Sequence, residues 1–181
     1  MGKVIFSINS TINGFADHTS GIVDDELHDF FADYLDNVDV VLMGRKTYEL
    51  MEDYWPVAHE DPRNTKSTLK FADKFNSVRK IIFTRTLKEV KWQNSKIAEK
   101  NLIETINVLK NEKGKNISAG SLSIASQLLE QNLIDEFWIL VHPIIAGDGK
   151  RLFESFNGKH ELKLANTLIF KSGVVVLHYQ K

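Results

Sequence analysis

Apolar and polar residues follow two different periods along the chain. Short runs that are apolar on both faces predict strands covered on each side, and apolar residues three or four positions apart predict amphipathic helices. Strands are expected at residues 3–8, 39–43, 80–84, 116–118 and 137–142, with helices at 24–36, at 48–51, at 99–113 and between Ser121 and Asn132. This alternation predicts an α/β fold with a mostly parallel central sheet.

Two parts of the chain depart from the alternation. Residues 161–171 and 173–181 are two strands joined at Lys171-Ser172-Gly173, which predicts an antiparallel hairpin at the C-terminal end of the sheet. Residues 52–77 are polar, contain Pro56 and Pro62, and are predicted to be irregular. No linker, repeat or low-complexity segment is visible, so residues 1–181 are expected to form a single domain.

The composition narrows the classes of function. The 181 residues carry a net charge of −1 and include no cysteine, which excludes disulfides, thiolate metal sites and thiol nucleophiles. There is no basic stripe for nucleic acid, and the six histidines lack the paired spacing of a metal site. Neither a membrane-spanning apolar run nor a signal peptide is present, so we expect a cytoplasmic protein without membrane or nucleic-acid partners.

Three predicted strands end in short segments that suit a bound anion. These segments are Gly44-Arg45-Lys46-Thr47, Thr84-Arg85-Thr86 and Ala119-Gly120-Ser121. A strand that enters a helix through small residues leaves backbone N–H groups uncovered at the positive end of the helix dipole, which favours a phosphate. Cations at a helix start oppose the same dipole, so helix stability alone explains Arg45 and Lys46 poorly. The alternatives are a tight strand-to-helix connection for the last segment and a solvated turn for the first.

The loop over residues 9–21 and the helix after it supply further candidates. Ile12, Phe15 and Ala16 are apolar residues in a polar loop, and they either hold the loop against the core or form a wall for a flat ligand. Asp24 lies nearest to the apolar stripe of its helix, so it is the acid expected to face a cleft. Alternatively, Asp24 only caps the helix N-terminus.

Six segments form a specific combination in this order: Thr11–Ala16, Met43–Glu49, Phe83–Thr86, Ala119–Ser121, Leu133–Glu136 and Pro143–Phe153. The combination resembles the dihydrofolate reductase superfamily. Within it, the chain is most similar to the reductase domain of bifunctional riboflavin-biosynthesis proteins and its stand-alone bacterial relatives. The resemblance covers nearly the whole chain. It implies a dihydrofolate reductase-like fold with helices on both faces of the sheet, and a reduced nicotinamide cofactor, NADPH.

The resemblance also implies individual roles. The cofactor phosphates would be met by Gly44, Arg45, Lys46 and Thr47, and the pyrophosphate would lie against Ala119, Gly120, Ser121 and Leu122. The 2′-phosphate, which distinguishes NADPH from NADH, would be held by Thr84 and Arg85. The nicotinamide would lie against Ile12. The family usually has an acid at Asn13 and glycine at Ala119. By analogy, an unusual Ala119–Gly120 peptide bond is expected, with a cis bond as one form. Relatives are commonly dimers, which implies a homodimer formed through the C-terminal hairpin and the strand before it.

Three functions are compatible with these residues. The first is an NADPH-dependent oxidoreductase that transfers hydride to a small pteridine- or pyrimidinone-like heterocycle, similar to 5-amino-6-(5-phosphoribosylamino)uracil reductase, with Asp24 as the catalytic acid. The second is a nucleotide-binding module without efficient catalysis. The third is a genuine dihydrofolate reductase, which ranks below the first because the position of the acid is uncertain.

Overall fold

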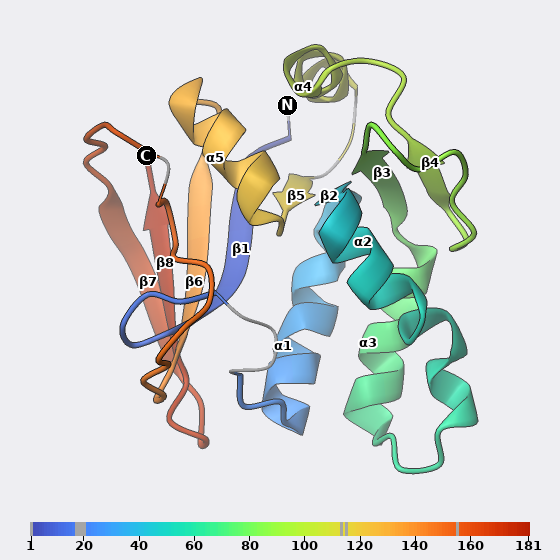
Figure 1. Ribbon diagram of the computed structural model, residues 1–181. Helices are drawn as coiled ribbons and strands as arrows, with labels where there is room; N and C mark the ends of the chain where they lie inside the picture. The colour runs from blue at the N-terminus through green and yellow to red at the C-terminus, as the bar shows by residue number, and fades with distance from the viewer. Residues whose placement is uncertain (1, 17–20, 113, 115, 155) are drawn as a thin grey trace.

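The computed structural model describes residues 2–16, 21–112, 114, 116–154 and 156–181 (Figure 1). Its centre is an eight-stranded sheet in the order β4-β3-β2-β5-β1-β6-β8-β7. The strands are β1 Val4–Thr11, β2 Val38–Gly44, β3 Arg79–Phe83, β4 Ser95–Ile97, β5 Asn116–Ala119, β6 Glu136–His142, β7 Lys163–Ile169 and β8 Val175–Gln180. The helices are α1 Asp25–Leu35, α2 Arg45–Glu52, the 3-10 helix η1 Trp55–Glu60, α3 Lys66–Ser77, α4 Leu102–Asn111 and α5 Leu122–Glu130.

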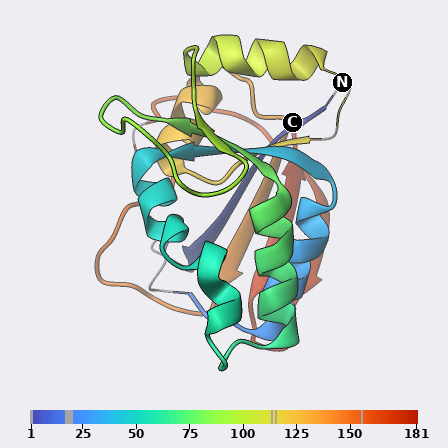
Figure 2. The same ribbon diagram turned by 90° about the vertical axis from the view of Figure 1, so that its right-hand side faces the viewer.

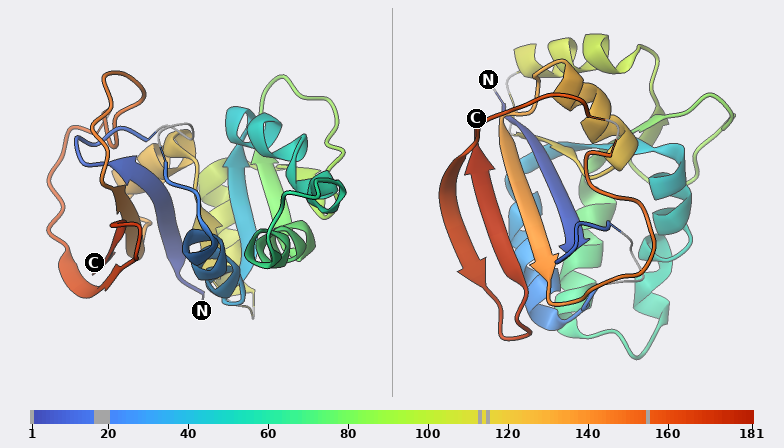
Figure 3. Two further views of the ribbon diagram at one scale, coloured as in Figure 1. Left: turned by 90° about the horizontal axis from the view of Figure 1, so that it is seen from below. Right: turned by 60° about the vertical axis from the view of Figure 1, so that its left-hand side comes forward.

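The sheet has a parallel part and an antiparallel part. The strands from β4 to β6 in this order run parallel, and β8 and β7 run antiparallel to their neighbours. Figure 3 shows β1, β6, β8 and β7 side by side, with the red hairpin outermost. The parallel strands therefore all end at one edge, here called the carboxyl edge, and all begin at the opposite amino edge. The predicted fold class is confirmed.

Helices cover both faces of the parallel part. On one face, Phe6 of β1 packs with Ile106 of α4 and Leu128 of α5, and none of the three side chains is exposed. On the other face, Leu27 of α1 packs against Leu140 of β6, and Phe75 of α3 belongs to a separate cluster on β2 and β3. Each fully buried side chain of this size contributes roughly 2 kcal/mol relative to an exposed one. Among the described residues, no helix combines the length and apolar character needed to cross a bilayer.

The prediction that residues 52–77 are irregular was wrong. It contains η1 and α3, and α3 lies beside α1 (Figure 2). The many polar residues of α3 face a row of acids on α1: Ser67 donates to Asp29 at 3.0 Å and Lys70 to Asp33 at 2.8 Å. The polar side chains of α3 therefore find partners on α1, although in the sequence alone they are typical of a loop.

Other boundaries shift by a few residues. The strand β4 was missed because it has only three residues, and β1 extends to Thr11. The helix predicted over 99–113 starts at Leu102, because the Asn101 side chain accepts from the Glu104 N–H at 2.9 Å and caps it. It ends at Asn111, so the structure also corrects Gly114 as its closing residue, while Lys113 lies outside the described residues.

Candidate functional site

The ends of β3, β2 and β5 lie next to one another at the carboxyl edge. Gly44 pairs with Phe83 in β3, and Leu42 pairs with Ala119 in β5. A Cβ atom built on Gly44 would lie 3.0 Å from the Ser121 hydroxyl and 2.9 Å from the Ser123 hydroxyl, so β2 ends close to the start of α5 and a larger residue would displace these hydroxyls. Arg45, Arg85 and Gly120 each follow one of these strand ends, so all three emerge at this edge.

The two helices that start here lack side-chain caps. The N-cap residues of α1, α3 and α4 accept a hydrogen bond from the first helical turn, whereas Gly44 before α2 and Ser121 before α5 do not. Ser121 occupies the N-cap position predicted for it, but its hydroxyl lies 3.3 Å from that of Ser123 instead. Within the described part of the chain, two sets of N–H groups without side-chain caps therefore lie side by side at the positive ends of two helix dipoles.

The cations at this edge differ in their partners. Arg45, in the first turn of α2, forms two hydrogen bonds with Glu49 at 2.8 and 3.0 Å, and about 40% of its side chain is exposed. Lys46 and Arg85 are exposed, and neither pairs with an acid in the described part of the chain. The Thr84 hydroxyl accepts from the N–H groups of Thr86 and Leu87, which shapes the turn that carries Arg85. Thr47 is half-buried in the first turn of α2.

The turn between β5 and α5 corrects one expectation. No cis peptide occurs among the described residues, so the Ala119–Gly120 bond is trans. Ala119 continues the pairing of β5 with both neighbouring strands, and its methyl group is fully buried in the core. An extended alanine needs no special backbone conformation, which explains why it replaces the glycine usual in the family. Gly120 is half-buried beside the Ser7 carbonyl, and Leu122 opens α5.

The loop after β1 is fastened to the loop after β6. The Asn13 amide donates to the Ala146 carbonyl at 2.7 Å and accepts from the Ala146 N–H at 3.1 Å. An aspartate could make only the second of these bonds, which accounts for asparagine at this position. Each of the two interpretations of the loop's apolar residues holds for one of them. Phe15 is buried and holds the loop against the core, whereas Ile12 is 61% exposed and free to contact a ligand. Residues 17–20 lie outside the described part of the chain.

Asp24 caps α1. Its carboxylate accepts from the Leu27 N–H at 2.8 Å, as the alternative interpretation predicted. It is half-buried, and its charge acts on His142 at the end of β6. The structure thus places an acid beside the carboxyl edge, and one of its oxygens is already used as the cap. Its catalytic role stays a prediction.

Two residues at this edge were not predicted as site residues. His142 ends β6 with only 1% of its surface exposed, and its Nε2 lies 3.1 Å from Oδ1 of Asn9 on β1. The contact joins residues that are far apart in the sequence, so local spacing gave no signal for it. Polar side chains at alternate positions of a strand, as at Ser7 and Asn9, were the only available hint.

The family assignment follows from comparison with known sequences. Residues 2–176 match the RibD C-terminal domain family. The chain belongs to this family. Membership supports an oxidoreductase of the riboflavin-pathway reductase type, which agrees with the resemblance found in the sequence motifs.

Individual relatives extend the comparison. YyaP from Bacillus subtilis (strain 168), an uncharacterized protein, is 35% identical over 181 residues, which are 98% of this chain and 94% of YyaP. The uncharacterized YwjB of the same organism is 27% identical over 98% of this chain and 97% of its own length.

Solved structures share the fold. A putative riboflavin biosynthesis protein from Shewanella sp. PV-4 has a TM-score of 0.72 and 18% identity, with 99% of this chain and 98% of that chain covered. A diaminohydroxyphosphoribosylaminopyrimidine deaminase/5-amino-6-(5-phosphoribosylamino)uracil reductase from Thermotoga maritima has a TM-score of 0.68 and 18% identity, over 99% of this chain and 56% of that chain. A pyrimidine reductase-like protein from Corynebacterium diphtheriae has a TM-score of 0.68 and 15% identity, over 99% of this chain and 91% of that chain.

Proposed function

We propose that the protein is an NADPH-dependent reductase that acts on a small pteridine- or pyrimidinone-like heterocycle. The observation that carries this proposal is the convergence, at one edge of the sheet, of two helix N-termini without side-chain caps and of Lys46 and Arg85, which pair with no acid among the described residues. A dinucleotide with a pyrophosphate and a further phosphate supplies the negative charges that such an arrangement suits. The family of riboflavin-pathway reductases supports the same reaction class.

The residues present fit the cofactor. The N–H groups at the starts of α2 and α5 would meet the pyrophosphate, with Gly44 and Gly120 allowing close approach of the backbone. Arg85 would hold the 2′-phosphate from the turn shaped by Thr84, and Ile12 would lie against the nicotinamide. When bound, NADPH supplies the hydride for an electron-poor C=N or C=O carbon. The chain's own contribution is to orient the two partners and to place Asp24 nearby for proton transfer through water.

A second candidate function is a nucleotide-binding module without efficient catalysis. It is favoured by one observation: Asp24 is engaged as a helix cap, so the acid is not free in the way a dedicated proton donor would be. Saturable NADPH binding without turnover on pteridines, dihydrofolate or aminopyrimidinones would support the module over the reductase.

The test of the proposed function is NADPH oxidation, followed by absorbance, with a panel of these heterocycles. We expect turnover with at least one of them and a preference for NADPH over NADH. Arg85→Ala should reduce that preference about tenfold or more, which corresponds to roughly 1.4 kcal/mol, because the 2′-phosphate loses its cation. Arg79→Ala is the matched control, since Arg79 is the first residue of β3, at the opposite amino edge, and pairs there with Glu112. An unchanged preference in Arg85→Ala would remove Arg85 from the site.

The proposed assembly is a homodimer formed through the C-terminal hairpin. Every residue of β7 is exposed, including Leu164 at 50% and Ile169 at 75%. An edge strand with apolar side chains is a ready surface for pairing with a second copy. Sedimentation of the purified protein checks the mass.

A further inference from the structure

The neighbours of His142 determine which of its two ring nitrogens carries the proton. This buried imidazole sits at the carboxyl end of β6, where its Nδ1 accepts a hydrogen bond from the backbone N–H of Ile22 at 2.9 Å. A backbone N–H can only donate, so Nδ1 carries no proton. The neutral ring therefore has its proton on Nε2, which lies 3.1 Å from Oδ1 of Asn9. Burial also lowers the pKa of His142, although the Asp24 charge raises it, so the neutral form is the stable one.

The tautomer of His142 in turn fixes the orientation of Asn9. Because Nε2 donates, the atom of Asn9 that faces it must be the carbonyl oxygen, and the NH₂ group points the other way. No group in the described part of the chain accepts a hydrogen bond from that NH₂. Asn9 is half-buried, so its unused donors are accessible.

Asn9 also lies beside the residues proposed to hold the cofactor. It is two residues beyond Ser7, whose carbonyl borders Gly120, so it lies about 7 Å further along β1 toward the carboxyl edge. It projects from the same sheet face as His142, the face that α1 covers, beside the start of that helix. The loop that carries Ile12 begins only two residues later.

We propose that Asn9 is a specificity-determining residue, whose NH₂ group donates to a lactam carbonyl oxygen of the heterocycle, and that His142 is the positioning residue that fixes this orientation. The inference rests on the proposed function and specifies its substrate: a ring with a carbonyl at this edge, in preference to one with an amino group. A site built to donate rejects an amino group in that place, because two N–H donors then face each other.

The sharpest variant is Asn9→Asp. One carboxylate oxygen keeps the bond from His142, and the other replaces the NH₂ group with a charged acceptor, so the group that faces the substrate changes from a donor to an acceptor. The probes are 2-amino-4-oxo-7,8-dihydropteridine and its 2,4-diamino counterpart, titrated by fluorescence into the NADPH-loaded protein. We expect the wild type to prefer the 4-oxo compound about tenfold or more, and Asn9→Asp to prefer the 4-amino compound. NADPH affinity should not change, and Asn166→Asp on the exposed strand β7 is the matched control.

A second pair of variants tests the role of His142. His142→Gln retains an acceptor and a donor and should keep most of the 4-oxo preference, whereas His142→Leu releases Asn9 and should lose it while NADPH still binds. Nitrogen NMR of the imidazole should show the proton on Nε2. These readouts stand even where Asn9→Asp does not fold.

The outcomes separate the inference from the function on which it rests. An unaltered 4-oxo preference in Asn9→Asp, no preference in the wild type, or a proton on Nδ1 would each overturn the inference while leaving the reductase intact. Failure of the wild type to bind or oxidise NADPH would instead refute the proposed function.

Discussion

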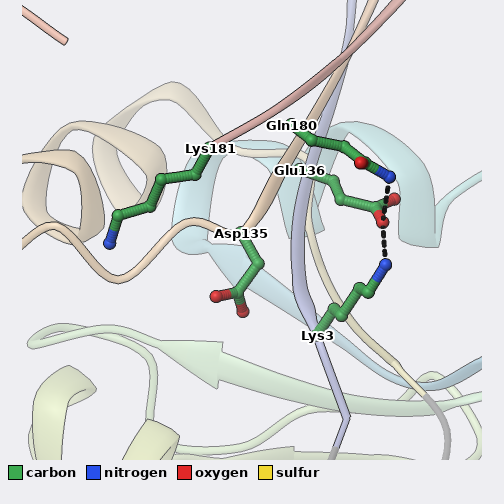
Figure 4. A pocket seen from close by; sticks show the side chains of 5 residues that line it. All are labelled: Lys3, Asp135, Glu136, Gln180 and Lys181. Carbon is green, nitrogen blue, oxygen red and sulfur yellow. Dashed lines mark hydrogen bonds and ion pairs between the residues drawn. The ribbon is translucent and has the colours of Figure 1, made fainter. Parts of the chain in front are cut away.

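The two edges of the sheet both carry cations but use them differently. At the amino edge, Lys3 pairs with the buried carboxylate of Glu136, and Lys110 pairs with Asp135 at 2.9 Å. Figure 4 shows Lys3 and Gln180 reaching Glu136, at the rim of a pocket of about 270 Å³. At the carboxyl edge, Lys46 and Arg85 have no such acids among the described residues.

This difference separates charges that pair within the protein from charges that we propose to pair with a ligand. The principal charges that line the amino-edge pocket are already bonded within the protein, so the pocket offers little to an incoming ion. The carboxyl edge has free N–H groups and cations whose repulsion from the helix dipole costs stability. A molecule keeps such an arrangement when a bound anion compensates for it, so unpaired charge supports the carboxyl edge, rather than the amino-edge pocket, as the proposed site.

The largest expected effect is on stability at the amino edge. Glu136 accepts from Trp138 at 3.2 Å and lies 3.1 Å from His178, besides its bonds to Lys3 and Gln180. Glu136→Ala leaves these groups without their acceptor and should lower the free energy of unfolding by about 3 kcal/mol, measured by urea denaturation. Glu161→Ala, which breaks only an exposed pair, should change it by less than about 0.5 kcal/mol. NADPH affinity should be unchanged in both, and a loss of affinity in Glu136→Ala would contradict the separation of the two edges.

The next effect is on pH dependence and should differ between the edges. Burial lowers the folded-state pKa of His142 below 6.5, so the unfolded chain binds the proton first and stability falls as the pH drops below about 6.5. Burial would raise the pKa of Glu136, but its bonds to Lys3 and Trp138 outweigh burial and the pKa lies below 4.5. The stability that Glu136 contributes is therefore lost only below about pH 4.5. On acidification, the carboxyl edge should therefore lose stability at a higher pH than the amino edge.

Hydrogen exchange checks this order. The Ile22 amide, which donates to His142, should lose protection between neutral pH and pH values below about 6.5, while the Trp138 indole N–H, which donates to Glu136, stays protected. His28 between α1 and α3 also has a pKa lowered by burial, so His142→Gln isolates the share of His142 in the stability change. Simultaneous loss at both edges would show that acid acts on the whole fold instead.

Local sequence patterns were sufficient for most of the fold and for part of the site. Strand ends are marked by short apolar runs, so the positions of Gly44, Arg85 and Gly120 at one edge followed from the parallel order alone. The family resemblance then assigned roles to these positions. In contrast, α3 was missed because its polar residues pair with α1, and that pairing is visible only once the two helices are adjacent.

Buried polar groups were the least predictable feature. Lys80, the second residue of β3, has no surface exposed. Its ammonium donates to the carbonyls of Asn76, Val78 and Gln93, and burial lowers its pKa to about 8. A lysine in a sequence predicts exposure, and only a cage assembled from distant segments reverses this. The bond between His142 and Asn9 has the same character, since 133 positions separate the two residues.

The smallest expected effect is the change in stability on substitution of Lys46, and its sign distinguishes a binding cation from a structural one. Lys46 lies exposed in the first turn of α2, so Lys46→Gln removes a positive charge from the positive end of a helix dipole and should raise the free energy of unfolding by about 0.3 kcal/mol. The same change should weaken NADPH binding about fivefold, an effect that shrinks at high salt because the charge is exposed. Lys3→Gln at the amino edge should do the reverse: stability falls because Glu136 loses its ion pair, and NADPH affinity stays constant. For each of the two variants, urea denaturation gives the free energy of unfolding and fluorescence titration gives the NADPH affinity. A cation that costs stability and adds affinity belongs to a binding site, so a loss of stability in Lys46→Gln without a loss of affinity would place Lys46 among the structural charges.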